Sequence, residues 1–420
     1  MKYDVVIVGG GTAGCAAAYM LGKYGKKVLI IEKNTFLGGS MTSSLVTPMM
    51  KTSENSINNE FLTTFIEKMK KYNSAITYSD GNNGWFNPQI AKIVLDELMK
   101  ESNVKVFYDS VLDTLDISLR HIKKIYVKSK MLSTPIEAKY FIDATGNCDL
   151  GFIANCNFQN KSNENQPTNL RFMMAGVDTR LFADWLLKID NDRNVTTVAE
   201  VDGQVHLSTA YTWDNDKKWA LKPYFDRGVK DGIIEDEDRN YFQIFTVPNM
   251  PDTIAFNCPR IHFEDNINPL DVNAYSEALI KGRSAILRLS RFCKKYFKGF
   301  EKAYISDIAD SLGIRTSRRI VGKYVYTIND LKSGKKFDNC ALISNYPVDV
   351  HSNKKDNSVL EHFMQEYQLP IEALMSADTD NLFVVGRCLS ADFYSQGALR
   401  IIPSCFSMGV AVAKFLNNIL

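Results

Sequence analysis

The feature that most constrains the fold of this chain is a glycine-rich turn at residues 9–14. Residues 3–8 form a short β-branched run, which is typical of a strand buried on both faces of a sheet. Residues 15–23 follow the turn with alanines and long side chains, which favour a helix. A second strand is expected at residues 27–31, and it ends on Glu32. This order of elements is typical of a dinucleotide-binding Rossmann unit.

The residue types in the turn, GGGTAG, match what a diphosphate requires of the backbone. Gly9 allows the tight turn, Gly11 lets the backbone approach the diphosphate, and Gly14 lets the helix pack closely on the strand. The first N–H groups of the helix, from Thr12 and Ala13 onward, lie at its positive dipole end and would stabilise the phosphates. Glu32 would accept hydrogen bonds from ribose hydroxyls, and its charge disfavours a 2′-phosphate. A chance G-x-G-x-x-G in an unrelated turn would not bring both strands, the helix and the acid with it.

The loop that follows Glu32 favours FAD over NAD. The fingerprint alone does not separate them, because both cofactors present an ADP half to the same turn. The loop begins with Lys33 and ends on Gly38, Gly39 and Ser40, and its paired glycines would let a longer, extended cofactor pass along the backbone.

The next hundred residues complete the expected nucleotide-binding sheet. A helix is expected at residues 88–101, where Pro88 suits the first helical position, and a strand at residues 104–108. Hairpin-like strands are expected at residues 122–127 and 136–142. They lead into a small-residue turn, Asp143-Ala144-Thr145-Gly146, which would let the backbone approach the cofactor closely.

Three sequence blocks carry a resemblance to a known family: FIDATGNCDL, SLGIRTSRRIVGKYVYT from Ser311, and NLFVVGRCLSADFYSQGALRIIPSCFSMGVAVA from Asn381. With the N-terminal fingerprint, they make the chain similar to the glutathione-reductase-like FAD oxidoreductases. Within that group it resembles the bacterial family called FAD-dependent oxidoreductase over nearly its whole length. One departure lies at Asn147-Cys148, where the family commonly has an acidic residue followed by a small one.

The resemblance implies non-covalently bound FAD and assigns residues to it. The pair Gly386-Arg387 is expected beside the ribityl-diphosphate, and the helix after Pro403 is expected to point its N-terminus at the flavin pyrimidine ring. The residues implied at FAD are Gly9, Gly11, Thr12, Ala13, Gly14, Glu32, Lys33, Gly38, Gly39, Ser40, Val111, Ala144, Thr145, Gly146, Gly386, Arg387, Arg400, Met408 and Gly409.

A local interpretation of the C-terminal block agrees with this assignment. Residues 382–385 are typical of a buried strand, and residues 404–416 form a small-residue helix that begins near Pro403. A positive helix end there would raise the electron affinity of the flavin. Arg400 would add to that effect, or it would pair with a carboxylate in a structural role. Cys148, Cys388 and Cys405 are interpreted as small buried hydrophobic residues and not as redox thiols.

The expected fold class is α/β, with a Rossmann-like FAD-binding domain and an inserted α+β substrate or cap domain. Residues 1–160 and 340–420 would form the discontinuous FAD-binding domain, and residues 161–339 the inserted domain, where the strand–helix alternation stops. In the inserted domain, residues 271–296 are expected to form a long helix with an apolar stripe facing the core. The stripe comprises Val272, Tyr275, Leu279, Ile286, Leu289, Cys293 and Tyr296.

Two residues are candidates for catalysis, Arg315 and His351. Arg315, Arg318 and Arg319 precede an expected strand at residues 320–326, and alternation would place Arg318 on the face opposite the other two. An inward arginine near the flavin would hold a carboxylate or phosphate by bidentate hydrogen bonds; the alternative is pairing with acidic residues across a domain seam. His351 follows YPVDV, which resembles a family segment, and is a candidate acid or base.

The expected function is an FAD-dependent oxidoreductase that transfers a hydride between a small molecule and flavin N5, with a separate electron acceptor or donor. An arginine near the flavin would favour an anionic substrate. The chain carries no second G-x-G-x-x-G for a separate NAD domain. One alternative is an RNA-modifying or partner-complex protein that carries FAD, and another is an NAD-dependent dehydrogenase.

Composition limits the possible binding partners and the cellular compartment. Fifty Lys and Arg residues against 48 Asp and Glu residues give a formal net charge of +2, which disfavours nucleic acid as a partner. The eight cysteines form no C-x-x-C pair and no metal-ligand cluster with histidine, so neither a metal site nor disulfides are expected, which suits the cytoplasm. No segment approaches the roughly 20 apolar residues of a membrane span.

Overall fold

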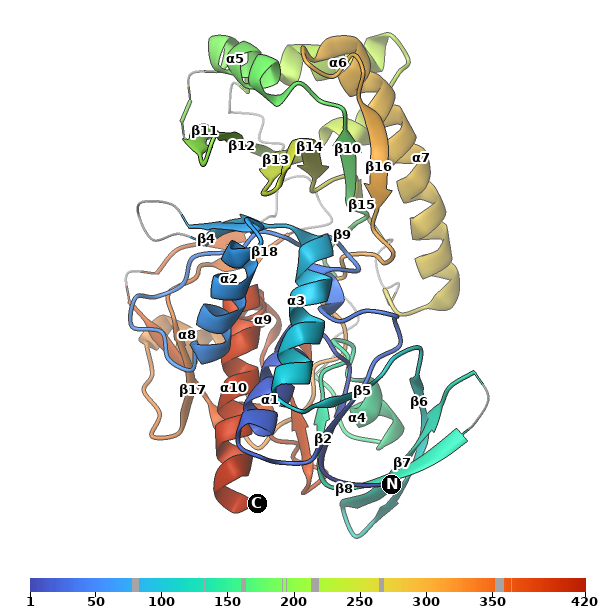
Figure 1. Ribbon diagram of the computed structural model, residues 1–420, viewed down its shortest axis with the longest axis vertical. Helices are drawn as coiled ribbons and strands as arrows, with labels where there is room; N and C mark the ends of the chain where they lie inside the picture. Colours follow the sequence, from blue (N-terminus) through green and yellow to red (C-terminus); the bar gives the residue numbers. More distant parts are fainter. Residues whose placement is uncertain are drawn as a thin grey trace.

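The protein is described from a computed structural model of the whole chain, in which two β-sheets lie one above the other (Figure 1). The described residues are 1–77, 83–130, 133–159, 164–190, 192–193, 195–212, 219–263, 268–351, 359–363 and 365–420. The α/β fold class expected from the sequence is confirmed by a parallel sheet with helices packed on it and a second, antiparallel sheet above.

The lower sheet has β1 at its centre. β1 pairs in parallel with β2 on one side and β8 on the other, β5 extends the β2 side in parallel, and β21 pairs in parallel with β8. Val5, Val6 and Ile7 of β1 are fully buried, because helices cover one face and a second apolar cluster covers the other. An antiparallel hairpin, β6 and β7, continues from β8. The strands are β1 Lys2–Val8, β2 Val28–Ile31, β5 Lys105–Phe107, β6 Val111–Ser118, β7 His121–Lys128, β8 Ser133–Asp143 and β21 Leu382–Val384.

The two ends of the chain meet on this sheet, as the sequence predicts. α10 (red in Figure 1) packs along α1, and a Cβ added at Gly409 would lie 2.3 Å from the carbonyl oxygen of Ala13. Only glycine allows two helices to approach so closely at that point. The helices around the sheet are α1 Thr12–Lys23, α2 Glu60–Lys71, α3 Pro88–Glu101, α4 Asp149–Ile153, α8 Ile328–Ser333, α9 Phe393–Leu399 and α10 Ile402–Ile419. α3 has the predicted bounds, and Asn87 caps it by accepting from the N–H groups of Gln89 and Ile90.

No single helix in the described part of the chain is long and apolar enough to cross a membrane. The pair α9 and α10 reaches that length and composition only together, and the two helices are bent by 92° to one another.

The upper sheet is built from six strands in the order β11-β12-β13-β14-β10-β16, with antiparallel neighbours throughout. Its apolar face packs against α5, α6 and the long helix α7. The strands are β10 Phe172–Ala175, β11 Thr196–Val201, β12 Gln204–Thr212, β13 Tyr241–Val247, β14 Met250–Phe256 and β16 Tyr304–Ile308. The helices are α5 Thr179–Ile189, α6 Lys222–Lys230 and α7 Val272–Tyr296.

α7 is confirmed as the long helix of residues 271–296, and Asp271 caps it through the N–H groups of Asn273 and Ala274. Ile286, Leu289 and Cys293 of the predicted stripe are fully buried. The prediction that Val272 faces the core is wrong. It is 72% exposed, because the first turn of α7 extends beyond the packed region.

The predicted strand at residues 320–326 is wrong. Ile320, Gly322 and Tyr326 form only isolated bridges to three different segments, so the stretch winds between elements and joins no sheet. The domain division at residues 160 and 340 stays a prediction. Tyr326 and Leu331 pack in the hydrophobic core of the lower sheet, which suggests that the second boundary lies before residue 326.

Short elements complete the fold. They are β3 Ala75–Thr77, β4 Asn83–Phe86, β9 Thr168–Asn169, β15 Arg260–Ile261, β17 Cys340–Ser344, β18 Val348–Val350, β19 Val359–Glu361 and β20 Tyr367–Pro370, with 3-10 turns at η1 Gly39–Met41, η2 Asp236–Arg239, η3 Ile371–Leu374 and η4 Gly386–Cys388.

Candidate functional site

In the glycine turn after β1, the fold requires glycine at Gly9 and Gly14 but not at Gly11. Gly9 has a φ of +101°, and a Cβ there would lie 2.5 Å from the carbonyl oxygen of Ala144. A Cβ at Gly14 would lie 2.2 Å from the carbonyl oxygen of Gly9. At Gly11 the nearest atom to an added Cβ is 3.5 Å away, and φ is −77°, which any residue adopts. The space beside Gly11 therefore suits an external group, as a diphosphate would be.

Glu32 holds the turn and the next loop together. It is 4% exposed, and its two carboxylate oxygens accept from the N–H groups of Gly10 and Asn34, each at 2.8 Å. Burial raises the pKa of Glu32. The N–H of Ser110 donates to the carbonyl of Glu32 at 3.0 Å, which brings the start of β6 alongside. Val111 there and Lys33 after Glu32 are both exposed.

The paired glycines of the following loop lie directly on the turn. The N–H of Gly38 donates to the carbonyl of Gly10 at 2.8 Å, and Gly38 and Gly39 have φ values of +107° and +54°. A Cβ at Gly39 would lie 2.8 Å from the Cα of Gly11, and Ser40 follows in the same 3-10 turn. The loop suits a cofactor that extends beyond the ADP half, as the sequence predicts for FAD.

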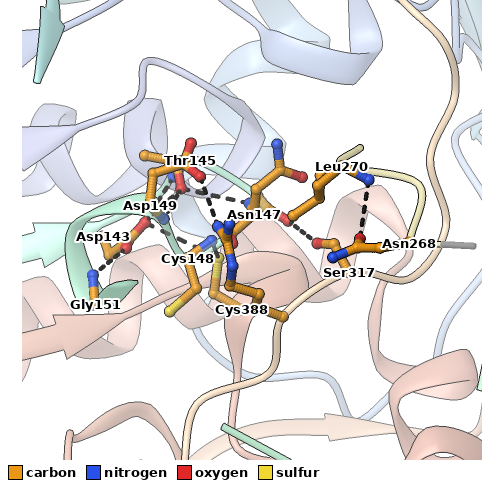
Figure 2. A network of polar contacts seen from close by, with 12 residues as sticks. Asp143, Thr145, Asn147, Cys148, Asp149, Gly151, Asn268, Leu270, Ser317 and Cys388 are labelled. Carbon is orange, nitrogen blue, oxygen red and sulfur yellow. Dashed lines mark hydrogen bonds and ion pairs between the residues drawn. The ribbon is translucent and has the colours of Figure 1, made fainter. Parts of the chain in front are cut away.

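The turn after β8 is organised by a buried carboxylate, Asp143 (Figure 2). Asp143 accepts from the N–H and hydroxyl of Thr145 at 3.0 and 2.7 Å and from the N–H of Gly151 at 3.0 Å. Burial raises its pKa. Ala144 and Gly146 are thereby held against the glycine turn and Arg387, respectively. Cys148, at the unusual position of the motif, donates its N–H to the sulfur of Cys388 at 3.0 Å.

The three cysteines singled out by the sequence are buried, as predicted. Cys148, Cys388 and Cys405 are 0%, 0% and 7% exposed, and burial raises the pKa of Cys148 and Cys405. High thiol pKa values make poor nucleophiles. Among the described residues, no group of three or more His, Cys, Asp or Glu side chains is placed to hold a metal ion.

Arg387 is a half-buried cation with neutral partners. Its guanidinium donates to the carbonyls of Gly146 and Ile314 and to the amide oxygen of Asn147. Burial lowers its pKa. A Cβ at Gly146 would lie 2.7 Å from the guanidinium, so glycine is required for this approach. A half-buried arginine beside the two turns, with no carboxylate partner among the described residues, fits the diphosphate of FAD.

Arg400 and the start of α10 form the other end of the predicted cofactor site. Arg400 donates to the carbonyl of Asp349 at 2.9 Å and lies 3.7 Å from its carboxylate, so the structural role left open by the sequence is present. Its Nε and the hydroxyl of Ser404 are buried without a partner in the described part of the chain. Those orphaned donors fit a further acceptor at this helix end. Met408 and Gly409, farther along α10, are enclosed in the core.

The structure brings Arg315 and His351 together with three arginines. We call this group the arginine cluster: Arg171, Arg260, Arg315 and Arg400, with His351 and Asp349. All four guanidinium charges act on His351, whose Nδ1 lies 3.2 Å from Nη2 of Arg260 and whose Nε2 lies 3.4 Å from Asp349. The cluster lies close to the predicted cofactor site, because Arg400 belongs to both and Arg171 donates to the carbonyl of Leu45, five residues after Ser40.

A network of neutral polar side chains holds the arginines of the cluster. Arg315 donates to the carbonyl of Pro167 and, at 2.9 Å, to the amide oxygen of Asn169. Asn169 bonds Asn257, whose amide donates to the hydroxyl of Tyr241 at 2.9 Å. The guanidinium of Arg260 stacks 3.8 Å above the ring of Tyr241. The arginines are thus fixed in place before any ligand arrives.

Arg318 and Arg319 have structural roles. Arg319 is 2% exposed and binds Glu164 and the carbonyls of Ala391 and Gln159. Arg318 is half-buried and pairs with Asp149 at 3.1 Å. The alternative of carboxylate pairing therefore applies to these two, whereas Arg315 has neutral partners.

Sequence reasoning missed Arg171, Arg260, Asp349 and the asparagine network. One signal for Arg171 was present: it interrupts the apolar run Leu170–Ala175, and an arginine enclosed in such a run is rarely buried without purpose. Arg260 and Asp349 have no comparable signal, because only the contact between the two sheets brings them together.

His351 makes the stability of the protein depend on pH. Burial and the charges of Arg315, Arg260 and Arg400 hold its pKa well below the usual range. The unfolded chain takes up this proton near pH ~6.5 and the folded chain resists it, so the stability present above that pH is lost as pH falls toward the lower folded pKa. We expect thermal unfolding of His351→Asn, which keeps an acceptor for Arg260, to depend less on pH between about 5 and 8. Equal pH dependence in both proteins would contradict this assignment.

Comparison with known proteins gives the family. The sequence model of the family described as FAD dependent oxidoreductase matches residues 4–415. A thiamine thiazole synthase of Pyrococcus horikoshii is 29% identical over 154 residues, which are 35% of this chain and 58% of that protein. The FAD-dependent oxidoreductase oblC of Cochliobolus heterostrophus is 32% identical over 84 residues, which are 19% of this chain and 17% of that protein. The chain thus spans well under two thirds of these relatives.

Solved structures that align with nearly the whole chain have low identity and TM-scores below 0.5. A geranylgeranyl bacteriochlorophyll reductase-like protein from Thermoplasma acidophilum has a TM-score of 0.47 at 14% identity, covering 99% of this chain and 78% of that one. The flavin-dependent brominase Bmp2 has a TM-score of 0.48 at 12% identity, covering 100% and 79%. Because the family match extends over nearly the entire chain, the protein belongs to the FAD-dependent oxidoreductase family, and its cofactor is FAD.

Proposed function

We propose that the protein is an oxidoreductase that transfers a hydride between a small anionic molecule and N5 of non-covalently bound FAD. The observation that carries the proposal is the arginine cluster, which shares Arg400 with the predicted cofactor site and contacts Leu45, five residues after Ser40. When bound, the flavin supplies the two-electron acceptor or donor. Arg400, Ser404 and the N-terminus of α10 would hold its pyrimidine end, and the turns at Gly11 and Arg387 its diphosphate.

The protein's own groups bind and orient the acid. Arg260 and Arg315 present guanidinium groups whose planar donors match a carboxylate or phosphate, and the network through Asn169 keeps them rigid. His351 stays neutral among them. Its Nδ1 accepts from Arg260, so His351 would take a proton only from a substrate that replaces Arg260 as the donor to Nδ1.

An anaerobic screen of small organic acids for bleaching of the flavin absorption tests this function. We expect certain acids to reduce the flavin and their uncharged amides to leave it oxidised. In Arg315→Ala, FAD should stay bound, while reduction by the same acid slows by about a hundredfold, because a buried charged hydrogen-bond donor is removed. Equal reduction by an acid and its amide would overturn the proposal, and loss of folding in the variant would assign Arg315 a structural role.

FAD as cofactor removes the NAD-dependent dehydrogenase. The RNA-modifying or partner-complex protein stays a prediction, and it requires a flavin that never turns over with small molecules alone. The electron acceptor or donor is a proposed partner of unknown identity.

We also propose the finer placement that the resemblance implies. The parallel order β5-β2-β1-β8 with β21 beside β8 supports a glutathione-reductase-like FAD domain, and the bacterial source rests on the three sequence blocks alone. All eight cysteines are free thiols, which supports a reducing compartment such as the cytoplasm.

A further inference from the structure

Two members of the arginine cluster, Arg171 and Arg315, are buried and lack a carboxylate partner in the described part of the chain, unlike Arg319 and Arg288. Arg319 pairs with Glu164, and Arg288 with Asp238 and Glu235. Arg171 and Arg315 are each 8% exposed, yet their partners in the described part of the chain are carbonyl and amide oxygens. Burying charges with neutral partners is costly, so the arrangement favours a site that a bound anion completes.

The charges of the cluster do not balance. Four guanidinium groups lie around one described carboxylate, Asp349, and His351 between them is neutral. Burial lowers the pKa of Arg171 to about 10, which is still far above neutral pH, so this guanidinium keeps its charge. Three positive charges therefore remain uncompensated among the described residues.

FAD accounts for only part of this excess. Its diphosphate is assigned to the turns beside Gly11 and Arg387, and Arg387 is not a member of the cluster. Arg400 is assigned to the pyrimidine end of the flavin. Arg171, Arg260 and Arg315 against Asp349 then leave two positive charges, and Nε of Arg260 is buried without a partner in the described residues.

We infer, on the basis of the proposed function, that the arginine cluster binds a small organic acid that carries two negative charges. Nε of Arg260 has no partner among the described residues and would donate to one acid group. Arg171 and Arg315 contribute two further positive charges to the cluster and would hold the second acid group of the ligand. The ligand is a dicarboxylate or a phosphate monoester, since both present two negative charges to guanidinium groups.

The ligand must also be small. The cluster is closely spaced: Arg260 lies 3.2 Å from His351, His351 lies 3.4 Å from Asp349, and Asp349 lies 3.7 Å from Arg400. Tyr241, under Arg260, is fixed by Gln243 and Asn257, so the cluster has little freedom to widen. Rigid, closely spaced cations favour a short acid over a long or polymeric one.

The test titrates the FAD-bound protein at about pH 8 with succinate, glycerol 3-phosphate, butyrate and butyramide, at constant ionic strength. Binding is read from the change in flavin absorption and from the melting temperature, so turnover is not needed. We expect succinate or glycerol 3-phosphate to bind at least about tenfold more tightly than butyrate, and butyramide to bind most weakly. The stronger of the two dianions identifies the acid group.

Substitutions of Arg260 test whether the preference for dianions arises from the arginine cluster. Arg260→Lys keeps the charge and removes the planar fork, and Arg260→Met removes both; each should reduce the dianion preference, Met more than Lys. Arg283→Met, on the exposed face of α7, is the matched control and should leave it unchanged. Equal binding of butyrate and the dianions overturns the inference and leaves the proposed function standing. Binding of no acid more tightly than butyramide overturns both.

Discussion

Replacing Gly11 with alanine should yield a folded protein that no longer retains FAD. An alanine Cβ at this position would meet no protein atom closer than 3.5 Å, and the backbone φ of −77° suits alanine. The methyl group would instead occupy the approach of the diphosphate to the backbone. We expect the affinity for FAD to fall by about a hundredfold or more, measured by the flavin content of the purified protein and by titration of the apoprotein.

Gly14→Ala is the control that separates cofactor binding from folding. Its Cβ would lie 2.2 Å from the carbonyl oxygen of Gly9 and 2.9 Å from the Cβ of Ala144, so helix α1 must move away from β1. We expect a loss of stability of about 1–3 kcal/mol, even in excess FAD. If Gly11→Ala retained FAD at full affinity, the diphosphate would not lie at this turn.

Replacing Arg319 with methionine should strongly destabilise the fold. Arg319 is 2% exposed and joins Gln159 and Glu164 to Ala391, which lies far from them in the sequence. Methionine has a similar length, but it leaves the carboxylate of Glu164 and two carbonyls without their donor. Breaking a buried ion pair on one side costs about 3–5 kcal/mol, so the midpoint of urea unfolding should fall clearly.

The neighbouring Arg318→Met is the matched control. Arg318 is half-buried and pairs with the exposed Asp149, and such pairs contribute only about 0–1 kcal/mol. Equal losses in the two variants would contradict the assignment of Arg319 as a buried connection between the segments.

The sequence predicts the lower sheet well because local patterns determine it. The run before Gly9, the alanine-rich stretch after it and the proline-started helix at Pro88 each indicate one element through propensity or capping. The strand predicted at residues 320–326 does not form, and the cause lies in its tertiary contacts. Its β-branched residues favour a strand, yet Ile320, Gly322 and Tyr326 each meet a different neighbour, so no ladder forms.

The candidate site is predicted only where a motif marks it. Gly9, Gly11 and Gly14 have positions fixed by their own turn, so their arrangement follows from spacing. Arg171, Arg260 and His351 are separated by up to 180 residues and meet because the two sheets come together around β9 and β15. No spacing rule connects them, which is why only Arg315 and His351 were expected.

We propose that the arginine cluster lies at the flavin and binds the anionic substrate. A crystal structure of the FAD-bound protein soaked with succinate would show both. We expect the diphosphate beside Gly11 and the pyrimidine end of the flavin at Arg400 and Ser404. Succinate should be bound by Arg260 and Arg315, next to the flavin ring. A flavin ring remote from these arginines, or succinate bound elsewhere, would contradict the claim.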